Sequence, residues 1–154
     1  MRSWPTERRC AVTYTLSVKD GDWDFSDRRG RVVTGRPKLV QQLGIWVAEQ
    51  LGVDRFHPNY GSSLQDMVGL PRSAATKMGV EKELRRVCIN YMNHQAALFD
   101  EHPADFSKDE VIVSVVYVES YYLGVELHAT VFVRTLAGTT ESLDFTVDEG
   151  GVAL

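Results

Sequence analysis

Residues 110–147 read EVIVSVVYVESYYLGVELHATVFVRTLAGTTESLDFTV, and this stretch decides the fold of the chain. Its first ten residues are nearly all apolar, which predicts a strand over 110–119 that is covered on both faces. Residues 125–134 and 140–147 alternate apolar and polar side chains, as strands with one buried face do. Ala137-Gly138-Thr139 predicts the hairpin turn between them. The stretch therefore predicts a three-stranded antiparallel meander.

Helical spacing of apolar residues dominates the chain before this meander. The pattern predicts three helices, over residues 34–52, 62–68 and 73–100. Ser62 or Ser63 is the expected N-cap of the short second helix, and His102-Pro103 ends the third. Helices followed by a strand meander give an α+β fold, with the helices packed on the C-terminal three-stranded sheet.

The N-terminal part of the chain is predicted to be an arm. Residues 10–18 alternate as a half-buried strand does, and this strand must either join the meander or project towards a partner. A charged loop over 22–31 carries Trp23 and Phe25, two aromatics with little use in an isolated domain. The expected organisation is an N-terminal strand and basic arm, an α+β domain and a loose tail, over residues 1–33, 34–147 and 148–154.

Composition and charge narrow the class of protein. The chain has 154 residues, of which 44% are hydrophobic and 25% charged, as expected for one globular domain. Its net charge of −4 is uneven, because residues 1–36 carry eight basic and five acidic side chains and the remainder carry nine and sixteen. An acidic body argues against direct nucleic-acid binding, whereas the basic arm suits an acidic partner surface.

Targeting signals and a cysteine framework are not evident in the sequence. Cys10 and Cys88 form neither a zinc motif nor a disulfide framework, and Cys88 falls in a helical pattern as a small core residue. The N-terminus lacks the apolar region of a secretory signal, and no stretch approaches the length of a membrane span. We expect synthesis in a reducing cytoplasm and no membrane partner.

No motif in the chain predicts catalysis, metal binding or a cofactor. There is no glycine-rich phosphate loop, no nucleophile elbow and no paired-histidine metal motif. His128 and Glu126 share one strand face, which is more typical of a solvated surface than of a site. Asp66 and Glu119 are the least implausible acid pair for glycoside cleavage, but nothing in the sequence brings them together. We therefore expect no enzymatic activity.

The segment Gly52-Val53-Asp54-Arg55-Phe56-His57-Pro58-Asn59-Tyr60-Gly61-Ser62-Ser63-Leu64 carries the most specific information. An amphipathic helix, an Arg and then Pro-x-Tyr-Gly-Ser-x-Leu resembles the baseplate wedge family of phage tails, which includes the sheath-initiating wedge subunit and has been labelled lysozyme-like. The order of elements over residues 22–147 is also similar. Val53-Asp54-Arg55 stands where contractile-tail members carry Gly-Glu-Arg, and the spacing from Arg to Pro is shorter by one, which favours a long-tailed, non-contractile phage.

The resemblance implies a structural subunit of a baseplate or tail tip, located in the virion and bound to other tail subunits and to copies of itself in a ring. Edge strands over 10–18, 125–134 or 140–147 are candidates for this assembly. The alternatives are a small cell-wall glycan hydrolase and a stand-alone adaptor domain. The partner-contact candidates are Trp23, Phe25, Arg28, Arg29, Arg31 and Arg55.

The residues of this loop each have an expected structural role. Pro58 should fix its approach, Gly61 should adopt a backbone angle that other residues avoid, and Ser62 should act at the helix start. Tyr60 and Phe56 are expected to pin the loop to the core.

Overall fold

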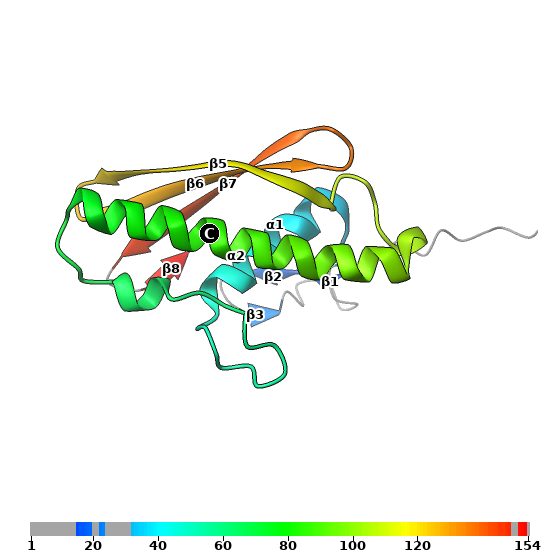
Figure 1. Ribbon diagram of the computed structural model, residues 1–154, viewed down its shortest axis with the longest axis horizontal. Helices are drawn as coiled ribbons and strands as arrows, with labels where there is room; N and C mark the ends of the chain where they lie inside the picture. Colours follow the sequence, from blue (N-terminus) through cyan, green and yellow to red (C-terminus); the bar gives the residue numbers. More distant parts are fainter. Residues whose placement is uncertain (1–14, 20–21, 24–31, 149–150, 154) are drawn as a thin grey trace, which may run out of the picture.

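The computed structural model describes residues 15–19, 22–23, 32–148 and 151–153. It confirms the α+β class, with an antiparallel sheet in one layer and the helices in the other (Figure 1). The two α-helices are α1 (Gly35–Ala48) and α2 (Ala74–Glu101), and the 3-10 helices are η1 (Leu64–Met67) and η2 (Pro103–Asp105). The main strands are β5 (Ile112–Leu123), β6 (Glu126–Thr135), β7 (Thr140–Asp148) and β8 (Gly151–Ala153).

The sheet has the order β5-β6-β7-β8, and every neighbouring pair is antiparallel. Val131 of β6 lies opposite both Val118 of β5 and Leu143 of β7, which fixes the register of the apolar face. Gly138 has a φ of 84° in the predicted turn between β6 and β7, an angle that glycine adopts without strain. The predicted meander is therefore confirmed.

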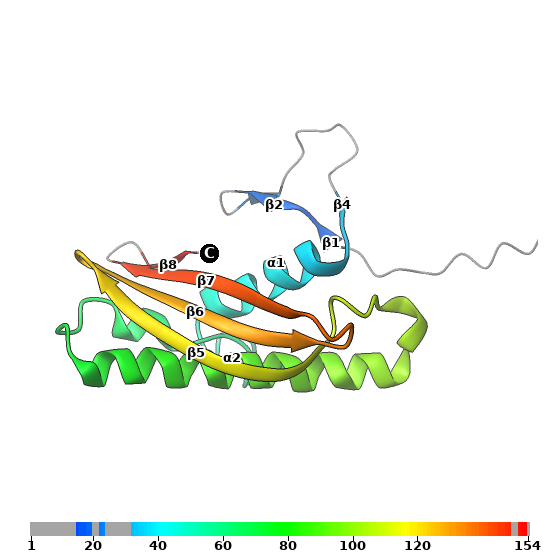
Figure 2. The same cartoon turned by 90° about the horizontal axis from the view of Figure 1, so that it is seen from above.

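The core lies between the helical layer and one face of this sheet. α2 packs mainly along β5, whereas α1 lies on the same face of the sheet but nearer the opposite edge, beside β8 (Figures 1 and 2). Burial of apolar surface at this interface is the main favourable contribution to folding. Its fully buried aliphatic side chains include Leu39, Leu43 and Val47 of α1, Val80, Leu84 and Val87 of α2, and Val131 and Val133 of β6.

The first strand of the meander is an edge strand, and the prediction that it is covered on both faces is wrong. Val113, Val116 and Tyr117 are 45%, 41% and 45% exposed, because both α-helices lie on the same face of the sheet. Register shifts between Ile112 and Ser114 and between Val115 and Tyr117 mark bulges. Bulges bend edge strands and discourage unwanted pairing, so the apolar run encodes an irregular edge rather than a central strand.

The C-terminal residues also differ from expectation. Within the predicted loose tail, residues 151–153 form β8, which pairs with β7 at Thr146–Asp148. The sheet consequently has a fourth, short strand that covers only one end of the β7 edge.

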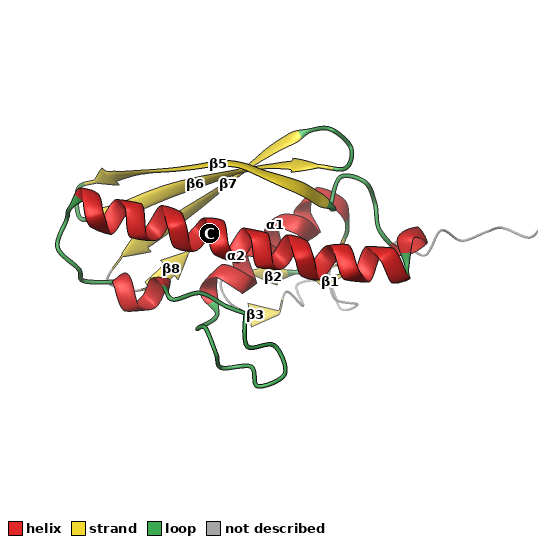
Figure 3. Ribbon diagram, viewed as in Figure 1, coloured by secondary structure: helices red, strands yellow, loops and turns green. Residues whose placement is uncertain are grey.

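The helices begin largely where predicted, and α2 also ends before His102-Pro103 as predicted, but α1 ends earlier than expected. Ser73 caps α2, and its side chain accepts a hydrogen bond from the Thr76 amide at 3.1 Å. Thr34 is the N-cap of α1 by position but makes no side-chain hydrogen bond to the helix, which ends at Ala48 rather than near Gly52. The predicted short helix is the 3-10 helix η1 (Figure 3).

The described part of the N-terminal region packs on α1 and does not join the main sheet. β1 (Thr15–Leu16) pairs with β4 (Val32–Val33), and β2 (Val18–Lys19) pairs with β3 (Asp22–Trp23). Gln41 of α1 holds this segment, because its Nε2 donates to the Leu16 carbonyl at 2.7 Å and its Oε1 accepts from the Val18 amide at 2.8 Å. Residues 10–14 of the predicted strand lie outside the described residues.

A buried ion pair connects α1 to the segment before β5. Lys38 Nζ lies 3.3 Å from Glu110 Oε1, and their side chains are only 5% and 1% exposed. The Lys38 ammonium also lies 5.1 Å from the centre of the Phe106 ring, within range of a cation–π interaction. Breaking such a pair leaves an uncompensated buried charge, so it fixes the position of α1 relative to the sheet.

Candidate functional site

The loop that resembles the wedge family leaves α1 and returns beside the end of that helix. The Ser62 amide donates to the Glu49 carbonyl at 2.7 Å, and the Leu51 amide donates to the Ser62 carbonyl at 2.9 Å. These bonds form a parallel bridge between Gln50 and Ser62. The bridge closes the base of the loop and explains why α1 ends before Gly52: the backbone there is paired with the returning chain.

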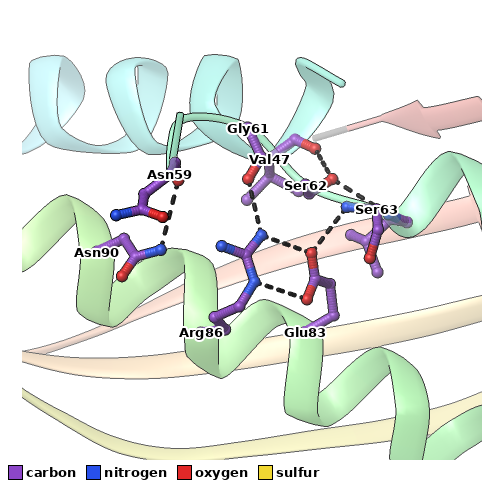
Figure 4. Close-up of polar contacts among 9 residues, drawn as sticks. Val47, Asn59, Gly61, Ser62, Ser63, Glu83, Arg86 and Asn90 are labelled. Atoms are coloured by element: carbon purple, nitrogen blue, oxygen red, sulfur yellow. Dashed lines mark hydrogen bonds and ion pairs between the residues drawn. The ribbon is translucent and has the colours of Figure 1, made fainter. Parts of the chain in front are cut away.

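Ser62 acts differently from the predicted helix cap. Its hydroxyl donates to the Val47 carbonyl at 2.5 Å and accepts from the Leu64 amide at 3.3 Å (Figure 4). Ser63 occupies the N-cap position of η1 but makes no side-chain capping bond. The fully buried Ser62 therefore satisfies a carbonyl in the last turn of α1, one of the groups that helix ends leave without an internal partner.

Gly61 passes very close to the backbone of the bridge. Its φ is 89°, and a Cβ at this position would lie 2.8 Å from the Gln50 carbonyl carbon and oxygen and from the Glu49 oxygen. Both the angle and the close approach require glycine.

The ion pair between Glu83 and Arg86 of α2 holds the part of the loop that returns towards α1. Glu83 accepts the Ser63 amide at 2.7 Å and the Arg86 Nε and Nη2 at 2.8 Å and 2.6 Å. Arg86 Nη2 also donates to the Gly61 carbonyl at 3.0 Å (Figure 4). The Arg86 guanidinium, together with the Ser63 amide, lowers the pKa of the Glu83 carboxyl despite its burial. The pair therefore fixes two consecutive peptide groups of the loop.

Aromatic contacts and a hydrogen bond secure the returning part of the loop around Asn59 and Tyr60. The Tyr60 ring meets the edge of Trp46 with ring centres 4.7 Å apart, and Trp46 meets Tyr91 of α2 in the same way at 5.4 Å. Asn90 Nδ2 donates to the Asn59 carbonyl at 3.4 Å. The Tyr60 ring therefore packs against the core, as expected, although Tyr60 is only partly buried.

The tip of the loop is a compact turn that directs Phe56 into solvent. Asp54 Oδ1 accepts the Phe56 amide, and Asp54 Oδ2 lies 2.8 Å from His57 Nδ1. The hydrogen bond from His57, with that from the Phe56 amide, lowers the pKa of the Asp54 carboxyl. The Tyr60 amide donates to the His57 carbonyl at 2.9 Å, with Pro58 at the second position of this turn, where its fixed φ suits the geometry.

The prediction that Phe56 pins the loop to the core is wrong, because its side chain is 90% exposed. Val53 beside it is 65% exposed, and the Arg55 side chain between them is also exposed. A pocket of about 360 Å³ lies under the tip, lined by Trp46, Phe56, His57, Pro58, Asn59, Tyr60, Asn90, Asn93 and His94. The tip therefore combines an exposed aromatic ring, an exposed apolar side chain and a cation above a pocket.

The other predicted contact residues fall largely outside the described part. Trp23 lies in β3, but its side chain is not described. Phe25, Arg28, Arg29 and Arg31 lie outside the described residues.

The candidate acid pair is not brought together. Asp66 is exposed on η1, in the helical layer. Glu119 is exposed on β5, and its neighbour Ser120 is buried against Glu81 of α2, so Glu119 points to the opposite, open face of the sheet. The two carboxylates lie on different faces of the fold and do not form one site.

The open face of the sheet carries His128, the residue that pairs with Glu126 in the sequence pattern. His128 Nε2 lies 3.1 Å from Glu126 Oε2, and its ring stacks on Tyr121 with centres 5.4 Å apart. Within the described ranges there is no group of three side chains able to hold a metal ion. None of the helices in this part of the chain is long and apolar enough to cross a membrane. Cys88 is fully buried, as predicted, and burial raises the pKa of its thiol to about 12.

Comparison with known proteins adds no relative. No protein-family model, no curated protein and no solved structure matches this chain.

Proposed function

We propose that this chain is a non-enzymatic structural subunit of a phage tail baseplate or tail tip, where it assembles through protein–protein contacts into a ring around the tail axis. Its partners are other tail subunits and further copies of itself, and its location is the virion. No cofactor, membrane or nucleic acid takes part. The resemblance of residues 52–64 to the baseplate wedge family motivates the proposal, and the structure of that segment supports a binding role.

The observation that carries the binding role is the exposure of Phe56. An aromatic ring that is 90% exposed costs solvation free energy in the isolated subunit. Aromatic side chains supply much of the binding energy at protein interfaces when a pocket on the partner takes them up. Phe56 has this character, because it stands at the tip with Val53 and Arg55 around it.

The anchoring of the loop also supports a binding role for its tip. The bridge from Gln50 to Ser62, the Glu83–Arg86 pair and the Trp46–Tyr60 contact hold the loop at its base and on its returning side. A loop that is ordered before binding loses less conformational entropy in the complex. A loop that is anchored by a partly buried ion pair and carries an exposed aromatic tip is therefore well suited to docking onto another subunit.

We expect Phe56→Asp to abolish incorporation of the protein into tails without unfolding it. The ring makes few contacts in the free subunit, so the melting temperature should stay within about 2 °C of the wild type, as for surface substitutions. Loss of an aromatic anchor costs about 2 kcal/mol or more of binding free energy, which corresponds to a decrease of about thirtyfold in affinity. Complementation of a deletion phage, followed by immunoblotting of purified particles, measures incorporation.

Met78→Asp is the matched control, because Met78 is also exposed, at 68%, but lies on α2 away from the loop. Normal incorporation of Phe56→Asp, or equal loss with both variants, would contradict a binding role for the tip. Absence of tail genes around the coding gene would argue against the phage assignment itself. A tape-measure gene upstream and a larger wedge gene downstream are the expected neighbours.

A further inference from the structure

One edge of the sheet is paired over only part of its length. β7 pairs with β6 from Thr140 to Val147, whereas β8 pairs with β7 only at Thr146–Asp148. Among the described residues, no strand pairs with the β8 side of β7 over residues 140–145. The unused backbone donors and acceptors of such an edge can bind an added strand.

This free edge forms one wall of a groove of about 560 Å³. Pro37, Val40 and Gln41 of α1 line the opposite wall, and residues 142–144 line the β7 wall. The ion pair between Arg36 and Glu141 lies at one end of the free stretch, and β8 lies at the other. The groove therefore adjoins the unpaired stretch of the β7 edge, and β8 pairs with the same edge farther along.

We propose that residues 10–14 of a second copy of this chain bind in the groove as an antiparallel strand paired with β7, in line with β8. The inference rests on the proposed self-assembly into a ring and names the partner segment and the surface it occupies.

The sequence of residues 10–14 fits the two faces of this edge. Leu143 and Phe145 are buried towards the helical layer, whereas Ser142 and Asp144 are exposed on the open face. A partner strand must therefore alternate apolar and polar or small residues. Residues 10–14 read CAVTY, so with Val12 opposite Leu143 the cysteine and tyrosine face the helices while Ala11 and Thr13 face solvent.

The geometry of β1 and β2 shows why the strand must come from another copy. Thr15 lines a cavity on the Lys38 and Gln42 side of α1, whereas Val18 lines the groove on the other side of this helix. Residue 15 would have to lie beside Thr140 for the same chain's residues 10–14 to adopt this register. Thr15 instead pairs with Val33 of β4, on the other side of α1, and therefore does not lie beside Thr140.

The charge distribution favours the same partner. Residues 1–36 have a net charge of +3 and residues 37–154 a net charge of −7, so the arm of one copy is attracted to the body of another. Donation of an arm to a different surface of the next copy is a heterologous contact, which closes into a ring when the rotation permits.

The first test is self-association of the full-length protein by sedimentation equilibrium across about 1–100 µM, the range expected for a small interface. Val12→Lys places a charge against the apolar wall and should weaken association by at least about tenfold. Thr13→Lys is the matched control, because its side chain faces solvent next to Asp144, and it should change association by less than about twofold. A monomer at every concentration, or equal weakening by both variants, would overturn the inference.

The second test locates the contact. In a Cys10→Ser background, a Thr13→Cys protein is mixed with a Ser142→Cys protein and oxidised, since these positions are neighbours across the proposed ladder. Formation of the mixed disulfide supports the inference, and Lys82→Cys, exposed on α2, is the acceptor that should not react. Equal cross-linking to both acceptors would overturn it. If Val12→Lys weakens self-association and the mixed disulfide forms, but the protein never enters tails, the proposed function alone is refuted. If the protein enters tails but neither result is obtained, the inference alone is refuted.

Discussion

Gly61→Ala should destabilise the protein far more than alanine at Gly52, Gly69, Gly124 or Gly138, where no atom lies within 4 Å of the position that a Cβ would occupy. The substitution forces a side chain into a backbone angle, φ 89°, that costs about 1–2 kcal/mol for residues other than glycine. It also places Cβ 2.8 Å from backbone atoms of Glu49 and Gln50, which cannot move without opening the bridge to Ser62. We expect the free energy of unfolding to fall by about 3–4 kcal/mol, a size reserved for strained or overpacked sites.

Gly52→Ala separates the two causes. Gly52 has a similar φ of 82°, but no atom lies within 4 Å of the position that its Cβ would occupy. This variant should lose only the conformational part, about 1–2 kcal/mol. Urea denaturation of both proteins measures the difference. If the two variants lose the same free energy, close packing of the bridge does not stabilise the loop.

The sheet is the part of this fold that the sequence predicted best. Leu127, Val131 and Val133 alternate with polar residues because one face of β6 is buried and the other is open, so the pattern reports burial directly. The start of α2 at Ser73 and its end at His102-Pro103 could also be predicted, because both depend on local chemistry alone.

Features that depend on contacts distant in sequence were not predictable in this way. The apolar run of β5 looks like a covered central strand, because a single strand carries no information about which layer lies above it. Likewise, α1 was expected to continue to Gly52, but the returning chain at Ser62 takes the backbone groups near Glu49 and Leu51.

In the candidate site, too, local features could be predicted from the sequence and contacts between distant segments could not. The sequence indicated that the loop has unusual residues, yet Phe56 was expected in the core. The available signal was Asp54 two residues before it, because an Asp side chain that accepts the amide of Phe56 forms a turn that leaves the next side chain outside. Arg86 lies outside the apolar stripe of the α2 sequence, and only the tertiary fold shows its contact with the Gly61 carbonyl.

Glu83→Gln should remove a pH-dependent part of the stability that the loop anchor supplies. The Glu83 side chain is 11% exposed, and its carboxylate accepts hydrogen bonds from both the Arg86 guanidinium and the Ser63 amide. A glutamine keeps the shape but presents an amide group to Arg86, so one donor faces another and the guanidinium loses its counter-charge. We expect a loss of about 2 kcal/mol at pH 7, as for a partly buried pair whose remaining partner keeps some contact with solvent.

The pH dependence gives this prediction its specific signature. The pKa of Glu83 is lower in the folded protein than in the unfolded chain, so its contribution is fully present above the unfolded value of about 4.5. The contribution disappears as the pH falls from there through the lowered folded pKa, where the carboxyl is protonated in both states. The difference in unfolding free energy between wild type and Glu83→Gln should therefore be constant from about pH 7 to 5 and then shrink towards acid.

Urea denaturation at a series of pH values measures this difference, with Glu101→Gln as the control. Glu101 is the exposed last residue of α2, and its substitution should change the stability by less than about 0.5 kcal/mol at every pH. Arg86→Lys adds a second check, because lysine retains the charge but cannot make both contacts with Glu83 and also reach the Gly61 carbonyl. A gap between wild type and Glu83→Gln that stays constant down to pH 3 would show that packing, rather than the charged carboxylate, holds the loop against α2.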